Sequence, residues 1–434
     1  MRTTPTRSIL PAPATRTSST RPESGALARC VEPLSAEEFL ADWWEDRPLV
    51  VERGGKARFD DLLSVADLER LVTRGALRHP AFRLVKAGER ISVRDYTVDV
   101  PWRPEAFAKT LDVERVAAAF ADGATIVVQG LHHWWHPLAV FCRALEAELD
   151  EPVQANAYYT PRDSQGLPVH HDTHDVFVLQ LAGEKRWLVY EPAWELPLKE
   201  QRYSSEMGAP GEPLHDVVLG PGDTLYLPRG WLHEAVTSVT DSLHLTVGVN
   251  VYTWADAVRA ALTECEDEVA FRRSIPADGE GGDALLGFLA ERLDPGDVAR
   301  RRRERFVRTR RPILDDQLAQ LRGAAELRLD TPVERRSTVL ADLRREGDGV
   351  VLLFEGKELT FPARARDAIE HLVGAADHVT PSELPGDLDG EGRLVLVRRL
   401  VREGFLRIAA TPSPGRDGSP RRSDADAVES PRRT

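Results

Sequence analysis

The sequence predicts a mainly β core of the double-sheet, jelly-roll type, followed by a helical region and a small module of helices with a β-hairpin. Runs of β-forming residues recur between about residues 125 and 252, separated by Gly, Pro and Asp. The apolar period becomes helical after Tyr252, and a hairpin pattern with flanking helices begins near Val333. A chain of 434 residues, 42% of them hydrophobic, is long enough for two or three folded units.

The composition argues against several classes of protein. A net charge of −13 disfavours direct nucleic-acid binding by the chain as a whole. The cysteines Cys30, Cys142 and Cys265 are far apart and odd in number, so we expect neither disulfides nor a zinc site, and a reducing, cytoplasmic location. No apolar run reaches membrane-spanning length, and the amino-terminal segment lacks the apolar core of a secretory signal. We therefore expect no membrane partner.

Both ends of the chain are rich in Pro, Ser, Gly and charged residues. We expect residues 1–30 and 411–434 to be disordered, because they cannot bury enough apolar surface to offset the entropy of ordering. The first folded part should open with a helix over Ser35–Trp44, where a Ser-x-x-Glu capping box precedes apolar residues at helical spacing. Similar spacing predicts a second helix over Asp60–Val72.

The β-rich runs belong to a first domain that we place at residues 31–252. The predicted strands lie at residues 125–129, 156–160, 176–182, 185–190, 223–228 and 243–252. Glycine permits positive φ, so we predict β-hairpin turns at Gly183–Lys185 and Gly220–Asp223. Strands at this spacing suit a jelly roll whose inward side chains line a central site.

Residues 253–330 are predicted to be helical. One apolar stripe has the helical period and comprises Trp254, Val258, Leu262, Cys265 and Val269. Further helices are expected over residues 283–293, 298–307 and 314–327. Because apolar stripes need a partner surface, we predict a homodimer built through this region. The arginine-rich run from Arg300 to Arg311 is interpreted as a solvated helix face with salt bridges, in preference to a nucleic-acid or ribosome contact.

A third unit is predicted over residues 331–410. A hairpin with its turn at Glu355–Lys357 is followed by a helical pattern, a helix start at Thr380–Glu383, a further helix and a closing strand. Helices with a small β-wing indicate a winged-helix-like module. Acidic residues precede Leu394–Val401, the position of a recognition helix, so protein contact or dimer support is favoured over DNA binding.

A candidate metal site is divided between two segments of the β-rich part. His170 and Asp172 are two residues apart, so on a strand their side chains would leave the same face. His233, which follows a Gly-Pro-Gly-Asp turn and another apolar run, supplies a third ligand. Two histidines and one carboxylate form the facial triad with which non-haem Fe(II) oxygenases bind iron and keep positions open for a cosubstrate and O₂. The sequence therefore predicts an enzyme.

Lys185 follows on the returning strand and would point into the same interior. A buried lysine is costly unless it is paired with an anion, so an anionic cosubstrate is its expected partner. Alternation places His171 on the opposite face from the triad, whereas His174 shares the triad's face and is either a partly exposed histidine or a residue that faces the substrate. His244 lies on a predicted core strand, where packing and a place in the cosubstrate pocket both stay open.

The cluster of His132, His133 and His136 has the composition of a metal site. Its spacing also suits the start of a helix, and the two adjacent tryptophans favour packing against the β core. We prefer the structural role.

Three segments together resemble the JmjC-type ribosomal oxygenases of the cupin superfamily: residues 156–187, 228–235 and 241–247. The resemblance covers about Leu34 to Tyr252 and extends, through the helical and winged-helix-like parts, to about Ile408. It implies that the triad of His170, Asp172 and His233 binds Fe(II).

The resemblance also assigns the cosubstrate pocket. It implies that Lys185 and Tyr158 hold the distal carboxylate of 2-oxoglutarate, and that Asn156 and the loop Ser164–Gly166 frame the pocket. Where some relatives have a serine, this chain has Gly248, which removes one possible hydrogen bond to the cosubstrate. Asn250, Thr246 and His244 are the remaining candidates for contact with it.

The implied activity is hydroxylation of a protein side chain by Fe(II), 2-oxoglutarate and O₂. The expected substrate is His or Arg of a ribosomal protein, and the acidic balance of the chain favours a basic protein partner. The alternatives are a small-molecule hydroxylase of the same chemistry, a cupin with another metal and non-oxidative chemistry, and a non-catalytic peptide-binding module. Lys185 and the intact triad weigh against the last two.

Overall fold

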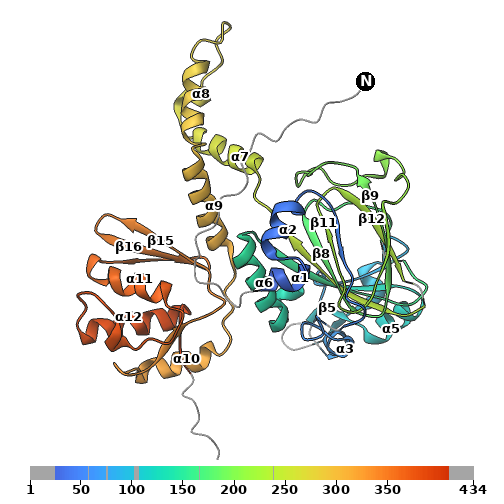
Figure 1. Ribbon diagram of the computed structural model, residues 1–434, viewed down its shortest axis with the longest axis horizontal. Coiled ribbons are helices and arrows are strands. Elements are labelled where there is room, and N and C mark those ends of the chain that lie inside the picture. Colours follow the sequence, from blue (N-terminus) through green and yellow to red (C-terminus); the bar gives the residue numbers. More distant parts are fainter. Residues whose placement is uncertain are drawn as a thin grey trace, which may run out of the picture.

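Two antiparallel sheets with an apolar layer between them form the core of the first half of the chain (Figure 1). The computed structural model describes residues 25–409 except for 57, 75–76, 102–106, 166 and 238. The strands of the larger sheet, in their order across it, are β1 (Leu49–Val51), β11 (Thr224–Leu227), β8 (Asp175–Ala182), β13 (Ser242–Val249), β7 (Val153–Thr160), β6 (Thr125–Val128), β2 (Phe82–Lys86) and β3 (Glu89–Arg90). The smaller sheet contains β10 (His215–Leu219), β9 (Lys185–Pro192) and β12 (Trp231–Thr237). The β core confirms the predicted jelly-roll class.

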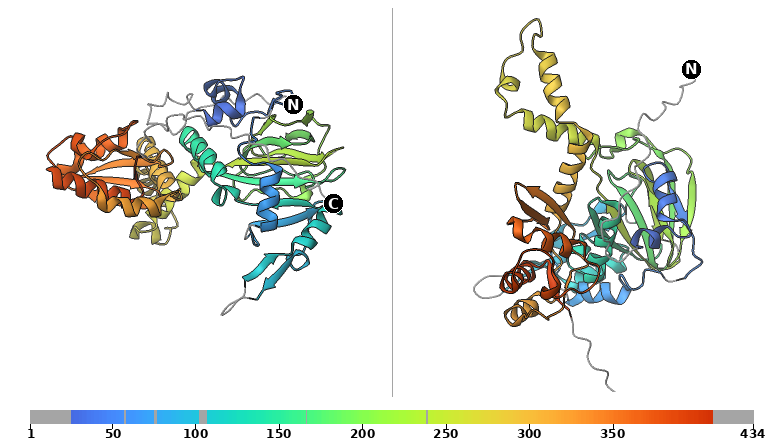
Figure 2. Two further views of the ribbon diagram at one scale, coloured as in Figure 1. Left: turned by 90° about the horizontal axis from the view of Figure 1, so that it is seen from below. Right: turned by 60° about the vertical axis from the view of Figure 1, so that its left-hand side comes forward.

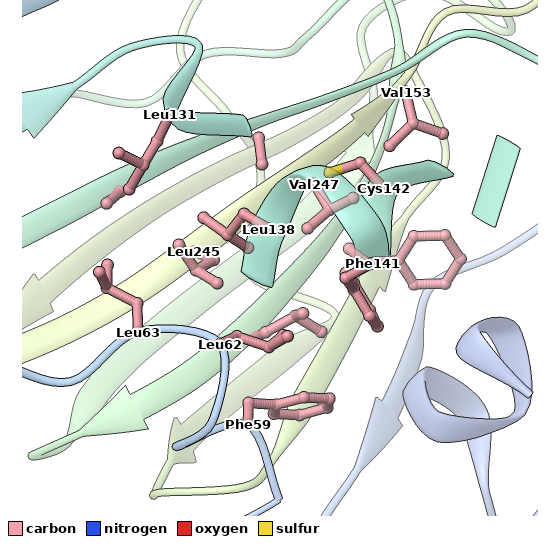
Figure 3. Close-up of a cluster of buried hydrophobic side chains, with 14 of the residues drawn as sticks. Phe59, Leu62, Leu63, Leu131, Leu138, Phe141, Cys142, Val153, Leu245 and Val247 are labelled. Carbon is pink, nitrogen blue, oxygen red and sulfur yellow. The ribbon is translucent and has the colours of Figure 1, made fainter. Parts of the chain in front are cut away.

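Both faces of the larger sheet are buried, which explains the continuous apolar run in β8. Val176 and Val178 face the smaller sheet, whereas Phe177 and Leu179 face a second apolar cluster on the outer side. In that outer cluster, Leu138 and other residues of helix α6 (His136–Leu149) pack on β13 (Figure 3). The strands are therefore held between the helical layer and the smaller sheet.

The remaining elements of the first half lie around these sheets (Figure 2). They are α1 (Ala26–Val31), α2 (Ala36–Asp42), α3 (Val65–Arg74), α4 (Val93–Tyr96), α5 (Val113–Ala121), η1 (Leu131–His133), η2 (Ser205–Met207) and the hairpin of β4 (Thr97–Val100) and β5 (Phe107–Leu111). The capping box before α2 is confirmed, because Ser35 and Glu38 exchange the two expected hydrogen bonds.

Two predicted boundaries near the amino terminus are wrong. Helix α1 falls inside the segment 1–30 that was expected to be disordered, because Leu27, Cys30 and Val31 bury apolar side chains in the core. The second helix begins at Val65 and not at Asp60, since Ser64 caps the backbone N–H of Asp67. Residues 1–24 and 410–434 lie outside the described residues.

The two predicted β-hairpins are also wrong. Gly183 does adopt a positive φ of 62°, but it connects β8 of the larger sheet to β9 of the smaller one. Gly222, with φ 91°, lies in the turn that returns the chain from β10 to β11 in the larger sheet. Both turns therefore cross between sheets, and the turn at Gly183 delivers Lys185 to the sheet opposite β8.

The second half of the chain is helical and then mixed. Its elements are α7 (Trp254–Cys265), η3 (Val269–Arg272), α8 (Gly282–Glu291), α9 (Pro295–Thr309), α10 (Gln317–Gly323), η4 (Ala324–Glu326), β14 (Val333–Arg335), β15 (Ala341–Glu346), β16 (Gly349–Phe354), β17 (Lys357–Phe361), η5 (Ala363–Ala365), α11 (Arg366–Gly374), η6 (Pro381–Glu383), α12 (Gly390–Glu403) and β18 (Leu406–Ile408). Figure 1 shows α7 and α8 projecting away from both the β core and the carboxyl-terminal unit. Within the described ranges, no helix has the length and apolar character needed to cross a membrane.

A buried ionic cluster joins the carboxyl-terminal unit to the β core. Arg143 on α6 donates hydrogen bonds to Glu146 at 2.9 Å and to Glu355 at 2.6 Å, and all three side chains are buried. Arg143 also donates to the backbone carbonyls of Thr338 and Arg311. Because Glu355 lies in the turn between β16 and β17, this single arginine fixes the relative position of the two units.

The arginine-rich run of α9 is largely paired within the chain, so its salt-bridge interpretation is supported. Arg302 bonds to Asp150 and Glu151, and Arg303 also bonds to Asp150. Arg310 pairs with Glu146 of the buried cluster. The run therefore attaches α9 to the β core and leaves few of its charges available to another molecule.

We expect replacement of Arg143 to destabilise the folded chain strongly. Arg143→Ala would leave Glu355 buried without its partner, which costs about 3–5 kcal/mol. Chemical denaturation should show this loss, whereas Arg186→Ala, which removes an exposed pair with Asp216 on the smaller sheet, should leave the free energy of unfolding nearly unchanged. Equal effects of the two substitutions would contradict the role assigned to the buried cluster.

Candidate metal centre

A backbone pairing brings the two predicted metal-binding segments together. Residues 170 and 233 form an isolated antiparallel bridge, in which His170 N–H donates to the His233 carbonyl at 3.0 Å and His233 N–H donates back at 2.8 Å. Directly paired residues project their side chains to the same side, and the two imidazole centroids are 4.4 Å apart. His170 precedes β8 and is not on a strand, so the predicted strand alternation is not what places it.

Each of these imidazoles has one nitrogen fixed by the backbone. His170 Nδ1 lies 2.8 Å from the Pro168 carbonyl, and His233 Nδ1 lies 3.0 Å from the Trp231 carbonyl. A carbonyl can only accept, so Nδ1 must carry the proton and Nε2 presents a lone pair. This arrangement is typical of histidines that bind a metal, because the second hydrogen bond sets both the tautomer and the ring orientation.

Asp172 completes a group of three potential ligands. Ligand atoms of His170, Asp172 and His233 all lie within 4.8 Å of one another. Burial would raise the pKa of Asp172, but the surrounding histidines, His174 first, outweigh it and lower the pKa below its usual value. Burial and the neighbouring His170 lower the pKa of His233 to about 4. At neutral pH the group therefore offers one carboxylate and neutral imidazole nitrogen, which are the forms that bind a divalent ion.

The three ligands line a cavity of about 390 Å³ between the two sheets, and Lys185 lines the same cavity. Lys185 is only 4% exposed, and its Nζ donates to Thr160 Oγ1 at 3.1 Å. Among the described residues, no carboxylate forms an ion pair with it. Burial lowers the pKa of Lys185 to about 7. A buried amine whose contact is only a hydroxyl is the feature that an anionic ligand would satisfy.

Aromatic side chains and unsatisfied polar atoms surround Lys185. The ring of Tyr158 stacks on His244 with centroids 5.0 Å apart, and Trp187 meets His244 edge to face. His244 Nδ1 and Trp187 Nε1 are buried without a hydrogen-bond partner. Burial, with Lys185 nearby, holds the pKa of His244 well below its usual value. These two atoms are therefore available to a ligand or to an ordered water.

Arg83 lines this cavity as a second cation, and the sequence analysis missed it. It lies on β2 and hydrogen-bonds to Tyr158, while its Nε has no partner. Arg83 is far in sequence from both triad segments. The only signal in the sequence is that a charged residue interrupts a short apolar run of the kind that forms a buried strand.

The other predicted site residues differ in their positions. Asn156 lines the cavity and accepts a hydrogen bond from Gly130 N–H at 2.9 Å. His174 lines it as well, whereas His171 does not and instead meets Tyr203 edge to face. Asn250 follows β13 and lines two different cavities, so the structure does not bring it to the triad.

Thr246 and the loop Ser164–Gly166 were also predicted to be near the cosubstrate pocket. Thr246 lies in the cavity wall beside Tyr158. In the loop Ser164–Gly166, Gln165 bonds to Glu234 at the cavity wall, whereas Gly166 lies outside the described residues.

The histidine cluster that begins at His132 lines a separate cavity of about 580 Å³. His132 Nδ1 accepts a hydrogen bond from Ala155 N–H at 3.1 Å, and His136 pairs with Asp315 at 2.9 Å. In the part of the chain that the structure describes, the triad is the one His, Cys, Asp and Glu group with metal-binding geometry. These contacts support the structural role preferred for the cluster.

Comparison with known proteins places this cavity in a family. The family model of the JmjC domain matches residues 133–257, which contain all three triad residues. The chain is 31% identical over 228 residues to a bifunctional lysine-specific demethylase and histidyl-hydroxylase NO66 of Drosophila persimilis, covering 51% of this chain and 31% of that protein. It is 30% identical over 257 residues to ribosomal oxygenase 2 of the mouse, covering 57% and 53%. It thus spans about half or less of the length of these relatives.

Solved structures show the same fold over a larger part of the chain. The ribosomal oxygenase YcfD of Escherichia coli superposes with a TM-score of 0.53 at 21% identity, covering 87% of this chain and 98% of that one. A structure of YcfD in complex with cobalt and 2-oxoglutarate gives a TM-score of 0.54 at 20% identity, covering 87% and 99%. Residues 133–257 thus match the JmjC domain, and the chain is similar in sequence to ribosomal oxygenases and shares the fold of one of them.

Proposed function

We propose that this protein is an Fe(II)- and 2-oxoglutarate-dependent oxygenase that hydroxylates a protein side chain. The observation that carries the proposal is the position of Lys185, a buried amine without an acidic partner, in the same cavity as the triad of His170, Asp172 and His233. A metal alone would leave Lys185 unexplained, and an anion alone would leave the triad unexplained. A metal with an anionic cosubstrate accounts for both.

The charges of the cavity fit this pair of ligands. Two basic side chains, Arg83 and Lys185, and two acidic ones, Asp172 and Glu234, line it. A divalent ion adds two positive charges and a dicarboxylate adds two negative ones, so the filled cavity stays neutral. A buried site with uncompensated charge would be strongly disfavoured.

When bound, iron with 2-oxoglutarate and O₂ supplies an oxidant that converts a C–H bond to C–OH, with release of succinate and CO₂. The chain's own residues provide the rest. His170, Asp172 and His233 would hold the ion, and three protein ligands would leave room for a cosubstrate and O₂. Lys185, with Thr160 behind it, binds the distal carboxylate. Tyr158 is held beside it by Arg83 and Thr246.

His244 and Trp187 close the same end of the cavity. The orphaned His244 Nδ1 and Trp187 Nε1 are positioned to hydrogen-bond the cosubstrate or a water that accompanies it. The aromatic rings exclude bulk water, which strengthens the contact between Lys185 and a carboxylate. Gly248 lies away from Lys185. The missing side chain at position 248 therefore does not affect the contacts around the Lys185 ammonium.

The proposed substrate is His or Arg of a ribosomal protein. The named relatives are ribosomal oxygenases and a histidyl-hydroxylase, and the net charge of −13 favours a basic protein partner. We place the reaction in the cytoplasm and assign direct nucleic-acid binding no part in it. A small-molecule hydroxylase with the same triad is the second candidate, because a cavity of about 390 Å³ also accommodates a metabolite.

The proposal includes the expected homodimer and the winged-helix-like unit. Trp254, Leu262 and Leu286 on α7 and α8 are 54%, 42% and 64% exposed, so the projecting helices present apolar surface that a second copy would cover. In the carboxyl-terminal unit, β15, β16 and β17 form a small sheet next to α11 and α12, which supports a winged-helix-like arrangement.

Replacement of any triad residue should abolish hydroxylation. We expect His170→Ala, Asp172→Ala and His233→Ala each to lower 2-oxoglutarate-dependent succinate release by more than about 100-fold, because even residues that only support metal ligands cost 10- to 100-fold. Mass spectrometry of ribosomal proteins should show the gain of one oxygen with the wild-type protein and with none of these three variants. His215→Ala, on β10 outside the cavity, is the matched control. Wild-type activity with bound iron in one of the three variants would remove that residue from the site.

The affinity for 2-oxoglutarate should fall as the pH rises above about 7. Lys185 in the free protein has a pKa of about 7 and loses its proton above that pH, whereas a bound carboxylate favours the ammonium. Binding therefore takes up a proton, and the affinity should decrease by up to about tenfold per pH unit until the pKa of the complex is passed. Calorimetric titration of the manganese-loaded protein in buffers of different ionisation enthalpy measures both effects.

Two variants distinguish the effect of the positive charge of residue 185 from the effect of its loss of a proton as the pH rises. Lys185→Arg stays protonated, so its 2-oxoglutarate affinity should not change between pH 7 and 9. Lys185→Met loses the charge and should bind about 10- to 150-fold more weakly at pH 7, which corresponds to about 1.5–3 kcal/mol. Wild-type binding that is independent of pH, with no proton uptake, would show that Lys185 does not hold the cosubstrate.

The projecting helices should hold two copies together. Light scattering at micromolar concentration is expected to give the mass of a dimer for the wild-type protein and of a monomer for a Leu262→Glu, Leu286→Glu variant, because a charge in an apolar interface is left desolvated. Val218→Glu introduces the same charge on exposed β10 and should leave the dimer intact. A wild-type monomer would exclude the proposed assembly.

A further inference from the structure

His174 lines the cavity wall and packs against Gly248, and the proposed function leaves this pair unused. A Cβ atom added to Gly248 would lie 2.3 Å from His174 Cδ2 and 2.5 Å from its Nε2. The imidazole therefore occupies the space that any larger residue at 248 would need. Gln154, which pairs with Gly248 across the strands, brings its Nε2 to 3.5 Å from His174 Nε2. The missing side chain of Gly248 thus makes room for the imidazole ring of His174.

The register of β7 and β13 shows where His174 and Gly248 lie along the length of the cavity. Thr160, the hydroxyl partner of Lys185, pairs with Ser242, whereas Gln154 pairs with Gly248 at the other end of the same two strands. Residues 154 and 160 are six positions apart, which corresponds to roughly 20 Å along a strand. The cavity therefore has a Lys185 end and a His174 end, with Tyr158 and His244 at the Lys185 side of its middle.

The cosubstrate and the substrate must use different ends. A dicarboxylate that bridges the metal and Lys185 extends toward the Lys185 end. The reacting side chain has to reach an open metal position from a direction that the cosubstrate does not cover, which leaves the His174 end. His174 is half-buried and lines the cavity, so it is accessible to a molecule that enters there.

We propose that His174, packed against Gly248, contacts the reacting side chain of the substrate. This contact would select a side chain that forms hydrogen bonds, such as an imidazole or a guanidinium. This inference rests on the proposed function and specifies its substrate class. One nitrogen of the His174 imidazole faces the Gln154 amide, and the other can donate or accept, so an apolar substrate side chain would leave that second nitrogen unpaired in a partly desolvated cavity. Sites that hydrogen-bond a substrate discriminate strongly against analogues that cannot.

Coordination of the metal by His174 fits the geometry less well. Within the described residues, the group with mutual ligand distances of 4.8 Å or less is His170, Asp172 and His233, without His174. The His174 ring is instead placed by Gly248 and Gln154. A pure packing role is also disfavoured, since His174 is not fully buried and borders the cavity.

Two single variants and their combination test the proposal on the full-length, metal-loaded protein. His174→Ala removes the contact, and Gly248→Ala forces the ring to move. Each should lower the gain of one oxygen on ribosomal proteins, taken from cells that lack the enzyme, by about tenfold or more. The double variant should be no worse than His174→Ala, because the added methyl acts only through the ring. The binding of 2-oxoglutarate to the manganese-loaded protein should stay within about twofold of wild type in all three.

Matched controls and the folding of the variants are part of the design. His215→Ala removes a histidine outside the cavity, and Gly220→Ala adds a methyl where the nearest atom is 3.6 Å away, so neither should change oxygen transfer. Should Gly248→Ala fail to fold, the double variant still folds if the ring is the obstacle. His174→Asn, which keeps a donor and an acceptor, should retain more activity than His174→Ala.

The outcomes separate this inference from the function on which it rests. Wild-type oxygen transfer in His174→Ala, or an equal loss of 2-oxoglutarate affinity and oxygen transfer, would overturn the substrate contact and leave the oxygenase intact. Succinate release by the wild-type protein without oxygen on any ribosomal protein would overturn the proposed substrate, and the His174 contact with it. Loss of succinate release in every protein, wild type included, would overturn the oxygenase itself.

Discussion

The pairing of residues 170 and 233 is the constraint on which the functional part of this molecule depends. Two reciprocal backbone hydrogen bonds join a loop before β8 to the smaller sheet, and through them both imidazoles point to one place. Asp172 is held in the same loop, because Gly230 N–H donates to its carbonyl at 3.0 Å. The metal ligands are thus positioned by main-chain contacts, and their side chains stay available to an ion.

The ligand residues could be predicted from the sequence, but much of their surroundings could not. A His-x-Asp triplet alone is a weak signal, but His170, Asp172 and His233 were identifiable because the two ligand segments occur in order with Lys185 on a strand between them. Arg83 reaches the same cavity only because β2 pairs with β6, and β6 with β7. That order of strands depends on long-range pairing, which local sequence patterns do not record. Asn250 was misplaced for the same reason, since one or two residues beyond the end of β13 suffice to leave the cavity.

The fold shows the same limit. Alternation and apolar runs predicted β6, β7, β8, β9, β11 and β13, and capping patterns predicted α2, because these signals are local. The turns at Gly183 and Gly222 were recognised as turns but were assigned the wrong partners. A glycine with positive φ permits a reversal between paired strands and a crossing between sheets equally well, and the choice depends on which strand lies nearby. Helix α1 was missed because its six residues form a helix mainly through burial of Leu27, Cys30 and Val31.

The charges of this chain are arranged in two opposite ways, and the contrast indicates where function lies. Arg143, Arg302 and Arg310 each have acidic partners within the chain, so the basic residues near α9 stabilise the arrangement of its parts. Lys185 has none among the residues that the structure describes, and the shift of its pKa from 10.5 to about 7 corresponds to roughly 5 kcal/mol of destabilisation below pH 7. This cost diminishes as the pH rises from 7 to 10.5, because the folded chain already holds the neutral amine and removing the proton from the lysine of the unfolded chain becomes easier. The fold pairs its buried arginines with carboxylates but, among the described residues, leaves the buried amine of Lys185 without one. The free energy lost by burying this amine is therefore lost at the one place where a bound dicarboxylate can restore it.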